Sequence, residues 1–259
     1  MSRTTVSRII HKNLKLKCLK RQELTSANLD ARLKRCKQLL RKFPIHTVDF
    51  IWFTDEKVFT VAPPSNTQND QVYVPSTTLK RNVNAERLLR TRPTFSHSVM
   101  VSVTVSKLGC SDLFFVAPGV KVDGAYYRDT LLTQQMLPAI RRMSGHSRDC
   151  FVFQQDSAPA HRALDTIQLL CRETPDFIRP ELWPPNSQDL NPVDYKIRVL
   201  MQDCVYQTAI HDVSELKQRL IAVWADMKQS VINKAINEWR SRLAASIRAK
   251  GRHFEHLLC

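Results

Sequence analysis

The sequence predicts an α/β fold in which a mixed β-sheet is covered by helices on its faces. The main evidence is the segment 48–54, VDFIWFT, which is apolar on both alternating faces. That pattern is typical of a central strand buried on both sides. Further strand-like segments follow, and the chain then alternates helix, strand and helix. The C-terminal part carries apolar stripes at helical spacing, which favours helices that pack on the sheet.

Two helices are expected before the first strand. In residues 4–14, Val6, Ile9 and Leu14 fall on one face and basic side chains occupy the other. A single helix cannot bury its own apolar face, so we expect a partner helix that this sequence lacks. A second helix is predicted over residues 25–42, because apolar residues recur at helical spacing until Pro44 ends it.

Strands joined by turns are predicted for the middle of the chain. A turn at Leu108-Gly109 would join two of these strands in a hairpin. The predicted strands cover residues 58–61, 72–74, 99–106, 113–116 and 150–154, and the short pair Phe177-Ile178.

Two helices are predicted between these strands. Asp123 is a suitable cap for a helix over residues 126–143, and Pro138 should interrupt or bend that helix. Residues 161–172 form the second predicted helix, between the strand at 150–154 and the short strand that follows.

Two more helices are predicted at the C-terminal end. Asp212 and Glu215 have the spacing of a capping box, and an apolar stripe follows them. A last helix is expected to begin at Ser230 and to end at Gly251, since glycine is the usual residue after a helix end.

Composition excludes several classes of protein. Of 259 residues, 43% are apolar and 24% are charged, which is ordinary for a folded domain and excludes a fully disordered chain. No stretch of 18 apolar residues occurs, so no membrane partner is expected. With five glycines the sequence has neither a dinucleotide-binding fingerprint nor a P-loop, so no nucleotide cofactor is expected.

Positive charge is concentrated at the N-terminal end. The net charge is +15, and residues 1–45 hold 13 basic side chains against two acidic ones. Such a basic arm indicates a polyanionic partner such as nucleic acid, although a solvated basic tail is the alternative. The candidate DNA contacts are Arg3, Arg8, Lys12, Lys15, Lys17, Lys20 and Arg21.

Seven cysteines predict reduced thiols and no disulfide framework. Their number is odd, no CxxC pair occurs, and the N-terminus lacks the apolar core of a secretory signal. His253, His256 and Cys259 have short, zinc-like spacing, but no fourth ligand is evident in the sequence. A helix end or tail without metal is therefore the favoured interpretation there.

Three carboxylates are the candidate catalytic residues. Asp55 follows the predicted central strand, Asp156 follows the strand at 150–154, and Asp194 lies just inside a helix start. Neighbouring strand ends could bring them together, and carboxylates at close range need a cation among them. Oxygen ligands select Mg²⁺ or Mn²⁺, and a pair of such ions can cleave a phosphodiester by in-line displacement.

Each acid also has a purely structural interpretation. Asp55 could be a turn residue, and Asp156 could form an Asx-turn into the Ser-Ala-Pro loop. Asn191 and Pro192 make an ordinary helix start, in which Asp194 would favour the helix dipole. With 24 acids in the chain, three aspartates by position alone are weak evidence for a metal site.

The sequences around these acids resemble those of mariner-type transposases. The matching segments are TDEK at 54–57, QDSAPAH at 155–161 and WPPNSQDLNPVDY at 183–195. Between Asp156 and Asp194 lie 37 residues, as in the branch of the superfamily with a third Asp. Asp189 is the rival for the third position, but the family pattern places the acid after Asn-Pro-Val, which favours Asp194. The resemblance covers nearly the whole chain, from a recognition-helix stretch at its start to the C-terminal tail.

The resemblance implies a ribonuclease-H-like DNA transposase acting in the nucleus. Asp55, Asp156 and Asp194 would hold Mg²⁺ or Mn²⁺, two ions in all, for hydrolysis at transposon ends and strand transfer into target DNA. His161 and Asn191 would orient the site, although capping and local packing explain them equally well. A homodimer on DNA is implied. Residues 1–45 would be the remnant of a helix-turn-helix region with its basic linker, and residues 46–259 the catalytic domain.

Two departures from the family pattern put the activity of this chain in doubt. Only the last helix of the N-terminal DNA-binding region is expected, and Arg198 stands where relatives usually have a large aromatic residue. An unpaired arginine buried there would be costly. The alternatives are a non-catalytic nuclear DNA-binding protein derived from a transposase, and a basic α/β protein whose acids only cap turns and helices.

Overall fold

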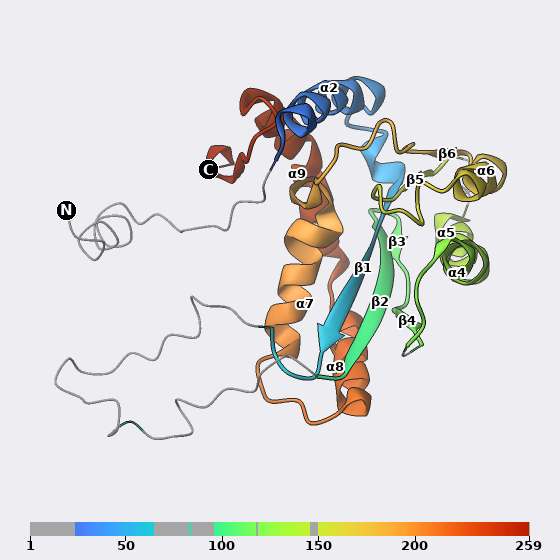
Figure 1. Ribbon diagram of the computed structural model, residues 1–259, viewed down its shortest axis with the longest axis vertical. Coiled ribbons are helices and arrows are strands. Elements are labelled where there is room, and N and C mark those ends of the chain that lie inside the picture. Colours follow the sequence, from blue (N-terminus) through green and yellow to red (C-terminus); the bar gives the residue numbers. More distant parts are fainter. Residues whose placement is uncertain (1–23, 65–82, 84–95, 118, 146–149, 259) are drawn as a thin grey trace.

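The computed structural model describes residues 24–64, 83, 96–117, 119–145 and 150–258. Its centre is a six-stranded mixed sheet in the order β3-β2-β1-β5-β6, with β4 paired to β2 (Figure 1). The strands are β1 (Ile51–Thr60), β2 (Ser98–Ser106), β3 (Gly109–Cys110), β4 (Phe114–Val116), β5 (Val152–Gln154) and β6 (Asp176–Phe177). This mixed sheet with flanking helices is the architecture predicted from the sequence.

The central strand β1 joins the antiparallel and parallel halves of the sheet. It pairs antiparallel with β2 from Phe53 opposite Val105 to Thr60 opposite Ser98. On its other side it runs parallel to β5, with Phe53 opposite Gln154. The strands predicted at 48–54 and 58–61 are therefore one strand, because the polar residues between them keep their backbone pairing with β2. Residues 48–50 form a short 3₁₀ turn (η2, Val48–Phe50) instead of strand.

Helices cover both faces of the sheet (Figure 1). One layer comprises η7 (Val193–Ile197), α7 (Arg198–Val205), α8 (Val213–Ala225) and α9 (Gln229–Arg248). The other comprises α4 (Gly124–Tyr126), η4 (Tyr127–Met136), α5 (Leu137–Ser144) and α6 (Leu164–Glu173). Within the described residues, no helix is both long and apolar enough to cross a membrane.

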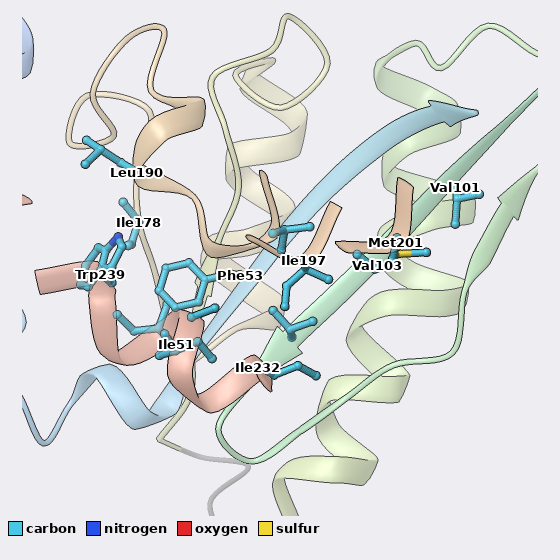
Figure 2. Packing of buried hydrophobic residues seen from close by; sticks show 14 of the residues in the cluster. Ile51, Phe53, Val101, Val103, Ile178, Leu190, Ile197, Met201, Ile232 and Trp239 are labelled. Atoms are coloured by element: carbon cyan, nitrogen blue, oxygen red, sulfur yellow. The ribbon is translucent and has the colours of Figure 1, made fainter. Parts of the chain in front are cut away.

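Alternate side chains of β1 belong to two separate hydrophobic clusters. Ile51 and Phe53 are fully buried on the α7–α9 side, where Phe53 meets Trp239 edge-on with ring centroids 5.4 Å apart (Figure 2). Trp52 points into the cluster on the opposite face together with Tyr127. This two-sided burial confirms the prediction of a central strand from the apolar run.

Several predicted helices are confirmed with their caps. α2 (Ser26–Lys42) matches the helix predicted at 25–42, and Thr25 accepts a hydrogen bond from the Asn28 amide at 3.2 Å. α8 begins at the predicted capping box, where Asp212 accepts from the Glu215 amide at 2.8 Å. The Glu215 carboxylate in turn accepts a hydrogen bond from the amide of His211 at 2.8 Å, one residue before the cap.

The helix predicted at 126–143 is present but irregular. Asp123 caps it by accepting from the Tyr126 amide at 2.9 Å. Residues of η4 form wide π-helical turns, and α5 then begins with Pro138 in its first turn. The proline therefore begins a new helical segment, which agrees with the predicted interruption.

Other boundaries differ from the predictions. The helix expected from residue 161 begins only at Leu164, because residues 155–163 form the loop that carries Asp156 and His161. β5 begins at Val152, and α9 ends at Arg248, before Gly251. The hairpin expected at Leu108-Gly109 is present, with β3 and β4 both antiparallel to β2. The predicted helix at 4–14 and strand at 72–74 lie outside the described residues.

The N-terminal helix α2 packs against α9 and the segment that follows it. Arg32 of α2 is fully buried and donates hydrogen bonds to the Gly251 carbonyl at 2.8 Å, the Asn186 carbonyl at 2.8 Å and the Ser187 hydroxyl at 2.7 Å. It also forms an ion pair with Asp189 at 2.6 Å. A single side chain therefore connects α2, the loop before η7 and the C-terminal segment.

Candidate active site

Asp55, Asp156 and Asp194 line one cleft at the end of the sheet. Asp55 lies in β1 two residues after Phe53, and Asp156 lies two residues after Gln154 of β5. Since Phe53 and Gln154 are partners in parallel strands, equal offsets bring the two acids to the same edge. Asp194 comes from η7, which packs against β1. The parallel register of β1 with β5 and the packing of η7 on β1 thus bring the three acids to one cleft.

The Arg198 side chain lies between Asp55 and Asp194. Its Nη1 atom contacts both Asp55 Oδ2 and Asp194 Oδ1, and its Nη2 atom donates to the Glu56 carbonyl at 2.9 Å. The three side chains are largely buried, with Arg198 17% exposed. The expectation of a costly unpaired arginine was wrong, because the two acids compensate its charge.

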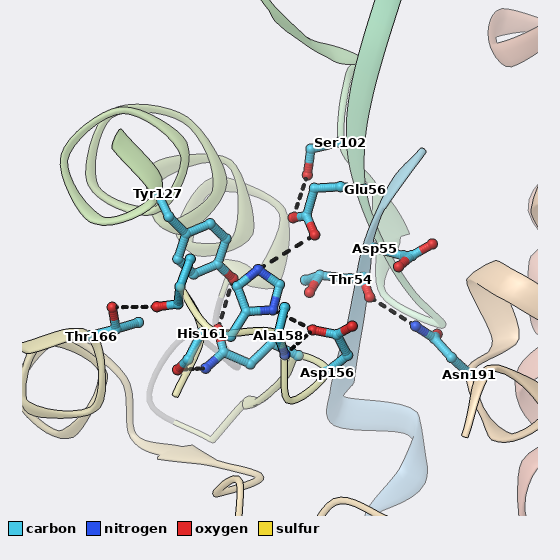
Figure 3. A network of polar contacts seen from close by, with 12 residues as sticks. Thr54, Asp55, Glu56, Ser102, Tyr127, Asp156, Ala158, His161, Thr166 and Asn191 are labelled. Carbon is cyan, nitrogen blue, oxygen red and sulfur yellow. Dashed lines mark hydrogen bonds and ion pairs between the residues drawn. The ribbon is translucent and has the colours of Figure 1, made fainter. Parts of the chain in front are cut away.

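Glu56 and Asp55 lie on opposite sides of β1, as alternate strand residues do (Figure 3). Glu56 is directed to His161, whose Nε2 lies 3.5 Å from Glu56 Oε2. It also accepts a hydrogen bond from the Ser102 hydroxyl at 3.2 Å. Glu56 was missed from the sequence, and its only signal there is its place next to Asp55 in TDEK.

His161 connects Glu56 to Asp156. Its Nδ1 lies 2.5 Å from Asp156 Oδ1, and its ring stacks on Tyr127 with centroids 4.1 Å apart (Figure 3). Asp156 Oδ1 also accepts from the Ala158 amide at 2.9 Å. The Asx-turn considered for Asp156 is therefore present, and it holds the carboxylate toward the cleft.

Burial raises the pKa values of the acids on the Arg198 side. Burial, reinforced by the charge of Asp194, raises the pKa of Asp55 to about 9, although Arg198 opposes the shift. Burial also raises the pKa of Asp194, against the effect of Arg198, and that of Glu56, against the effect of His161. These carboxyls therefore hold protons more readily than ordinary surface acids.

Asp156 and His161 behave in the opposite way, as an ion pair. Burial alone would raise the pKa of Asp156, but the hydrogen bond and charge of His161 lower it. Burial alone would lower the pKa of His161, but Glu56 and Asp156 together raise it. The pair favours a protonated imidazole beside an ionised carboxylate.

Asn191 fixes η7 against the central strand. Its side-chain amide donates to the Thr54 carbonyl at 2.9 Å, and its side-chain oxygen accepts from the Val193 amide at 3.1 Å. These bonds set the position of Asp194 relative to Asp55. Asn191 is thus a positioning residue by geometry, and it also caps the helix start.

Asp189, the rival for the third position, is engaged elsewhere. Its carboxylate pairs with Arg32, and it is absent from the described lining of the cleft. Among the described residues, one group of three His, Cys, Asp or Glu side chains brings its ligand atoms within 4.8 Å of one another: Asp189, His253 and Glu255. His253 of the zinc-like tail therefore meets two acids, while Cys259 lies outside the described residues.

The side chains that line the cleft include carboxylates, whose oxygens are suitable ligands for hard divalent ions. Asp55, Asp156, Asp194 and Glu56 present carboxylate oxygens, the ligands that Mg²⁺ and Mn²⁺ prefer. Asp55 Oδ2 is buried without a hydrogen-bond donor and has only the ion pair with Arg198. The fit is incomplete, because a guanidinium lies between two of the three aspartates.

Basic side chains join the acids in the cleft. Arg35 and Arg162 line it together with Arg198. Arg35 donates to the Trp183 carbonyl at 2.7 Å, so its charge is held at the rim by the Pro-rich segment. The predicted DNA contacts between Arg3 and Arg21 lie outside the described residues.

The chain is similar in sequence to two nematode transposases and matches no protein-family model. The transposable element Tc3 transposase of Caenorhabditis elegans is 25% identical over 240 residues, which cover 89% of this chain and 66% of that protein. The transposable element Tcb1 transposase of Caenorhabditis briggsae is 25% identical over 240 residues, which cover 90% of this chain and 80% of that protein. The chain thus spans about two thirds of the first relative's length.

Solved structures share the fold. The Mos1 mariner paired end complex with Mn matches with a TM-score of 0.78 and 21% identity, over 98% of this chain and 72% of the other. The catalytic domain of Mos1 mariner transposase matches with a TM-score of 0.68 and 18% identity, over 92% of this chain and all of the other. The predicted ribonuclease-H-like fold is thereby confirmed.

Proposed function

We propose that this chain is the catalytic part of a mariner-type DNA transposase, which hydrolyses phosphodiester bonds at transposon ends and joins the freed ends to target DNA. The observation that carries the proposal is the convergence of Asp55, Asp156 and Asp194 on one cleft. The transposase relatives and the shared fold support it. The proposal extends to work in the nucleus on DNA, as a homodimer that handles two ends together.

The chemistry assigned to the site needs no protein nucleophile. Asp55, Asp156 and Asp194 would hold two Mg²⁺ or Mn²⁺ ions. Such ions, when bound, supply an activated water and charge stabilisation at the leaving oxygen. His161 orients the Asp156 carboxylate through the 2.5 Å contact, and Asn191 keeps Asp194 in register with β1. Arg35 and Arg162 are suited to phosphates that enter the cleft.

Metal-dependent nicking of labelled duplex DNA tests this function. We expect the purified chain to nick DNA with Mn²⁺ and not with EDTA, and Asp156→Asn to reduce the rate at least a hundredfold. The matched control is Asp165→Asn, since Asp165 is 69% exposed and, among the described residues, pairs with Arg128 at 3.7 Å. The control should retain the wild-type rate.

The same assay separates the proposal from its main alternative. DNA binding without nicking, in wild type and Asp156→Asn alike, would identify a non-catalytic DNA-binding protein instead. Nicking that persists in Asp156→Asn would show that the activity does not come from this cleft. Either result would end the transposase assignment for the isolated chain.

A further inference from the structure

We propose that Arg198 is a built-in cation that occupies the place of one divalent ion between Asp55 and Asp194. Divalent ions would then bind this chain weakly, because the guanidinium must first be displaced. The inference deepens the proposed function and rests on it, since it concerns the same carboxylates. It makes Arg198 the residue that decides how strongly the cleft takes up metal.

The first support is position. One guanidinium nitrogen, Nη1, contacts a carboxylate oxygen of each aspartate, so the group bridges the two acids. The bridged oxygen of Asp55 has no hydrogen-bond donor among the described residues. The contact that the structure gives this oxygen is the ion pair with the Arg198 cation. The guanidinium fills the gap that a bridging metal ion would need.

The second support is anchorage. Nη2 donates to the Glu56 carbonyl at 2.9 Å, which ties the guanidinium to β1 as well as to the two acids. Arg198 and Asp194 are one helical turn apart, and that turn is held by Ile197 and Met201, which are buried in the core. An ion that enters must break both charge contacts and this hydrogen bond.

The third support is the balance of charge. Four carboxylates, Asp55, Glu56, Asp156 and Asp194, lie around the cleft edge. Besides Arg198, two cationic side chains act on these acids: His161, whose ring nitrogens lie 3.5 Å from Glu56 and 2.5 Å from Asp156, and Lys57, which interacts electrostatically with Asp55 and Asp194. Removal of Arg198 would take away the cation that, among the described residues, contacts both Asp55 and Asp194. Such a pair recruits a cation strongly, since like charges at this range repel.

The Asp156 side of the cleft differs, which explains why some metal binding should persist. The Asp156 side chain is 47% exposed and is held by His161 instead of Arg198. It can meet an ion from solvent without displacing the guanidinium. We therefore expect the wild type to bind a divalent ion weakly, and a variant with a neutral residue in place of Arg198 to bind it tightly.

Calorimetric titration of the full chain with MnCl₂, in the absence of DNA, tests the proposal. We expect Arg198→Met to bind Mn²⁺ at least tenfold more tightly than the wild type. The matched control is Arg219→Met. Arg219 also pairs with an acid four residues away, Glu215, and its side chain is 21% exposed, but it lies on α8 and not in the cleft. The control should bind Mn²⁺ as the wild type does.

The outcomes separate this inference from the proposed function. Equal Mn²⁺ affinities in wild type and Arg198→Met would overturn the role of Arg198 and leave the metal site standing. Weaker binding in the variant would also overturn it, because Arg198 would then support the site. No Mn²⁺ uptake by either protein would remove the proposed metal-dependent function itself.

A second variant and a second measurement distinguish a change in Mn²⁺ affinity from misfolding of Arg198→Met. Arg198→Gln keeps a polar side chain of intermediate length, and we expect it to bind Mn²⁺ more tightly than the wild type as well. At a fixed ligand concentration, the native state is stabilised more by a ligand that it binds more tightly. Hence about 1 mM Mn²⁺ should raise the melting temperature of both variants more than that of the wild type. Equal shifts would contradict the proposal.

Discussion

Two kinds of carboxyl group lie side by side in the cleft. Burial raises the pKa of Asp55 to about 9, whereas the imidazolium of His161 keeps the pKa of Asp156 below its ordinary value. Protons and Arg198 thus share the neutralisation of the acids on one side, and a histidine does so on the other. Asp55 and Asp156 occupy equivalent places after paired residues of β1 and β5, but their pKa values shift in opposite directions because their neighbouring side chains differ.

Stability in the absence of divalent ions should fall as pH rises. An unfolded aspartate loses its proton near pH 4, whereas native Asp55 keeps it to about pH 9. The native state therefore binds more protons between these values, and the free energy of unfolding decreases across this window. His161, whose native pKa is raised, adds to the decrease above its ordinary pKa. Urea unfolding in EDTA at pH 5, 7 and 9 measures the slope.

The Asp55→Asn variant isolates the contribution of that carboxyl. It should flatten the decrease between pH 5 and 9 by at least ~1.4 kcal/mol, which corresponds to one pKa unit. Asp165→Asn, at an exposed site, should leave the slope unchanged. A slope in Asp55→Asn equal to that of the wild type would contradict a raised pKa at this residue.

For single residues, the sequence predicted the positions of the acids better than it predicted the side chains that pair with them. Asp55 and Asp156 could be found because each follows an apolar segment, residues 51–53 of β1 and β5, and these two segments run parallel in the sheet. The role of Arg198 could not, because its two acids come from β1 and from its own helix, and only the tertiary structure brings them together. Glu56 was hidden for the same reason, since its partner His161 is distant in sequence.

Among the secondary-structure elements, polar residues inside apolar segments caused the main errors. The charged residues 55–57 of β1 predict the end of a strand in the sequence. In the structure, backbone pairing with β2 continues the strand to Thr60. α8 was predicted well because its capping box is a local signal, and α2 because its apolar residues recur at helical spacing until Pro44. The π-helical turns of η4 have no local signal in the sequence.

Gly251 sets how closely the C-terminal segment approaches α2. Its φ is +78°, and a Cβ there would lie 2.3 Å from the Leu29 carbonyl oxygen. Gly251→Ala should lower the free energy of unfolding by about 3 kcal/mol, because backbone strain and a backbone clash combine. Urea unfolding measures the change.

Gly119 provides the matched control for Gly251. Its φ is +79°, but nothing lies within 4 Å of a Cβ built there. Gly119→Ala should therefore cost only the strain of the left-handed conformation, about 1 kcal/mol. Equal losses at the two glycines would show that the close approach to α2 has no energetic weight.

For the whole molecule, the uneven charge is the main feature that sequence alone provides. The net charge is +15, yet most of this excess lies in residues 1–45. The layered fold followed from the apolar pattern because each layer must bury one face of its helices. Strand order did not follow from it, since the pairing of β1 with β5 joins segments about a hundred residues apart.

Affinity for DNA should depend steeply on salt, through the basic arm. Each phosphate contact adds roughly 0.9 to the slope of log affinity against log salt. Substitution of Lys12, Lys15 and Lys17 by glutamine in the full chain should weaken binding and lower this slope by up to about 2.7. Fluorescence anisotropy with a labelled duplex at several NaCl concentrations measures both.

An equal change of charge on the body of the protein is the control. Lys228, Lys234 and Lys250 are exposed residues of α9 and its flanks. Their substitution by glutamine should change the slope less than substitution in the arm. If both triple variants had the same slope, general charge and not the arm would govern binding.

The buried Arg32 makes α2 inseparable from the segment that leads to the cleft. Its guanidinium closes hydrogen bonds to the 186–189 segment and to Gly251 at once. If α2 were peeled away, Asp189 would lose its partner and the carbonyls of that segment their donors. We therefore expect the helix and the rim of the cleft to unfold together, because separating them would leave the buried Arg32 charge without its partners.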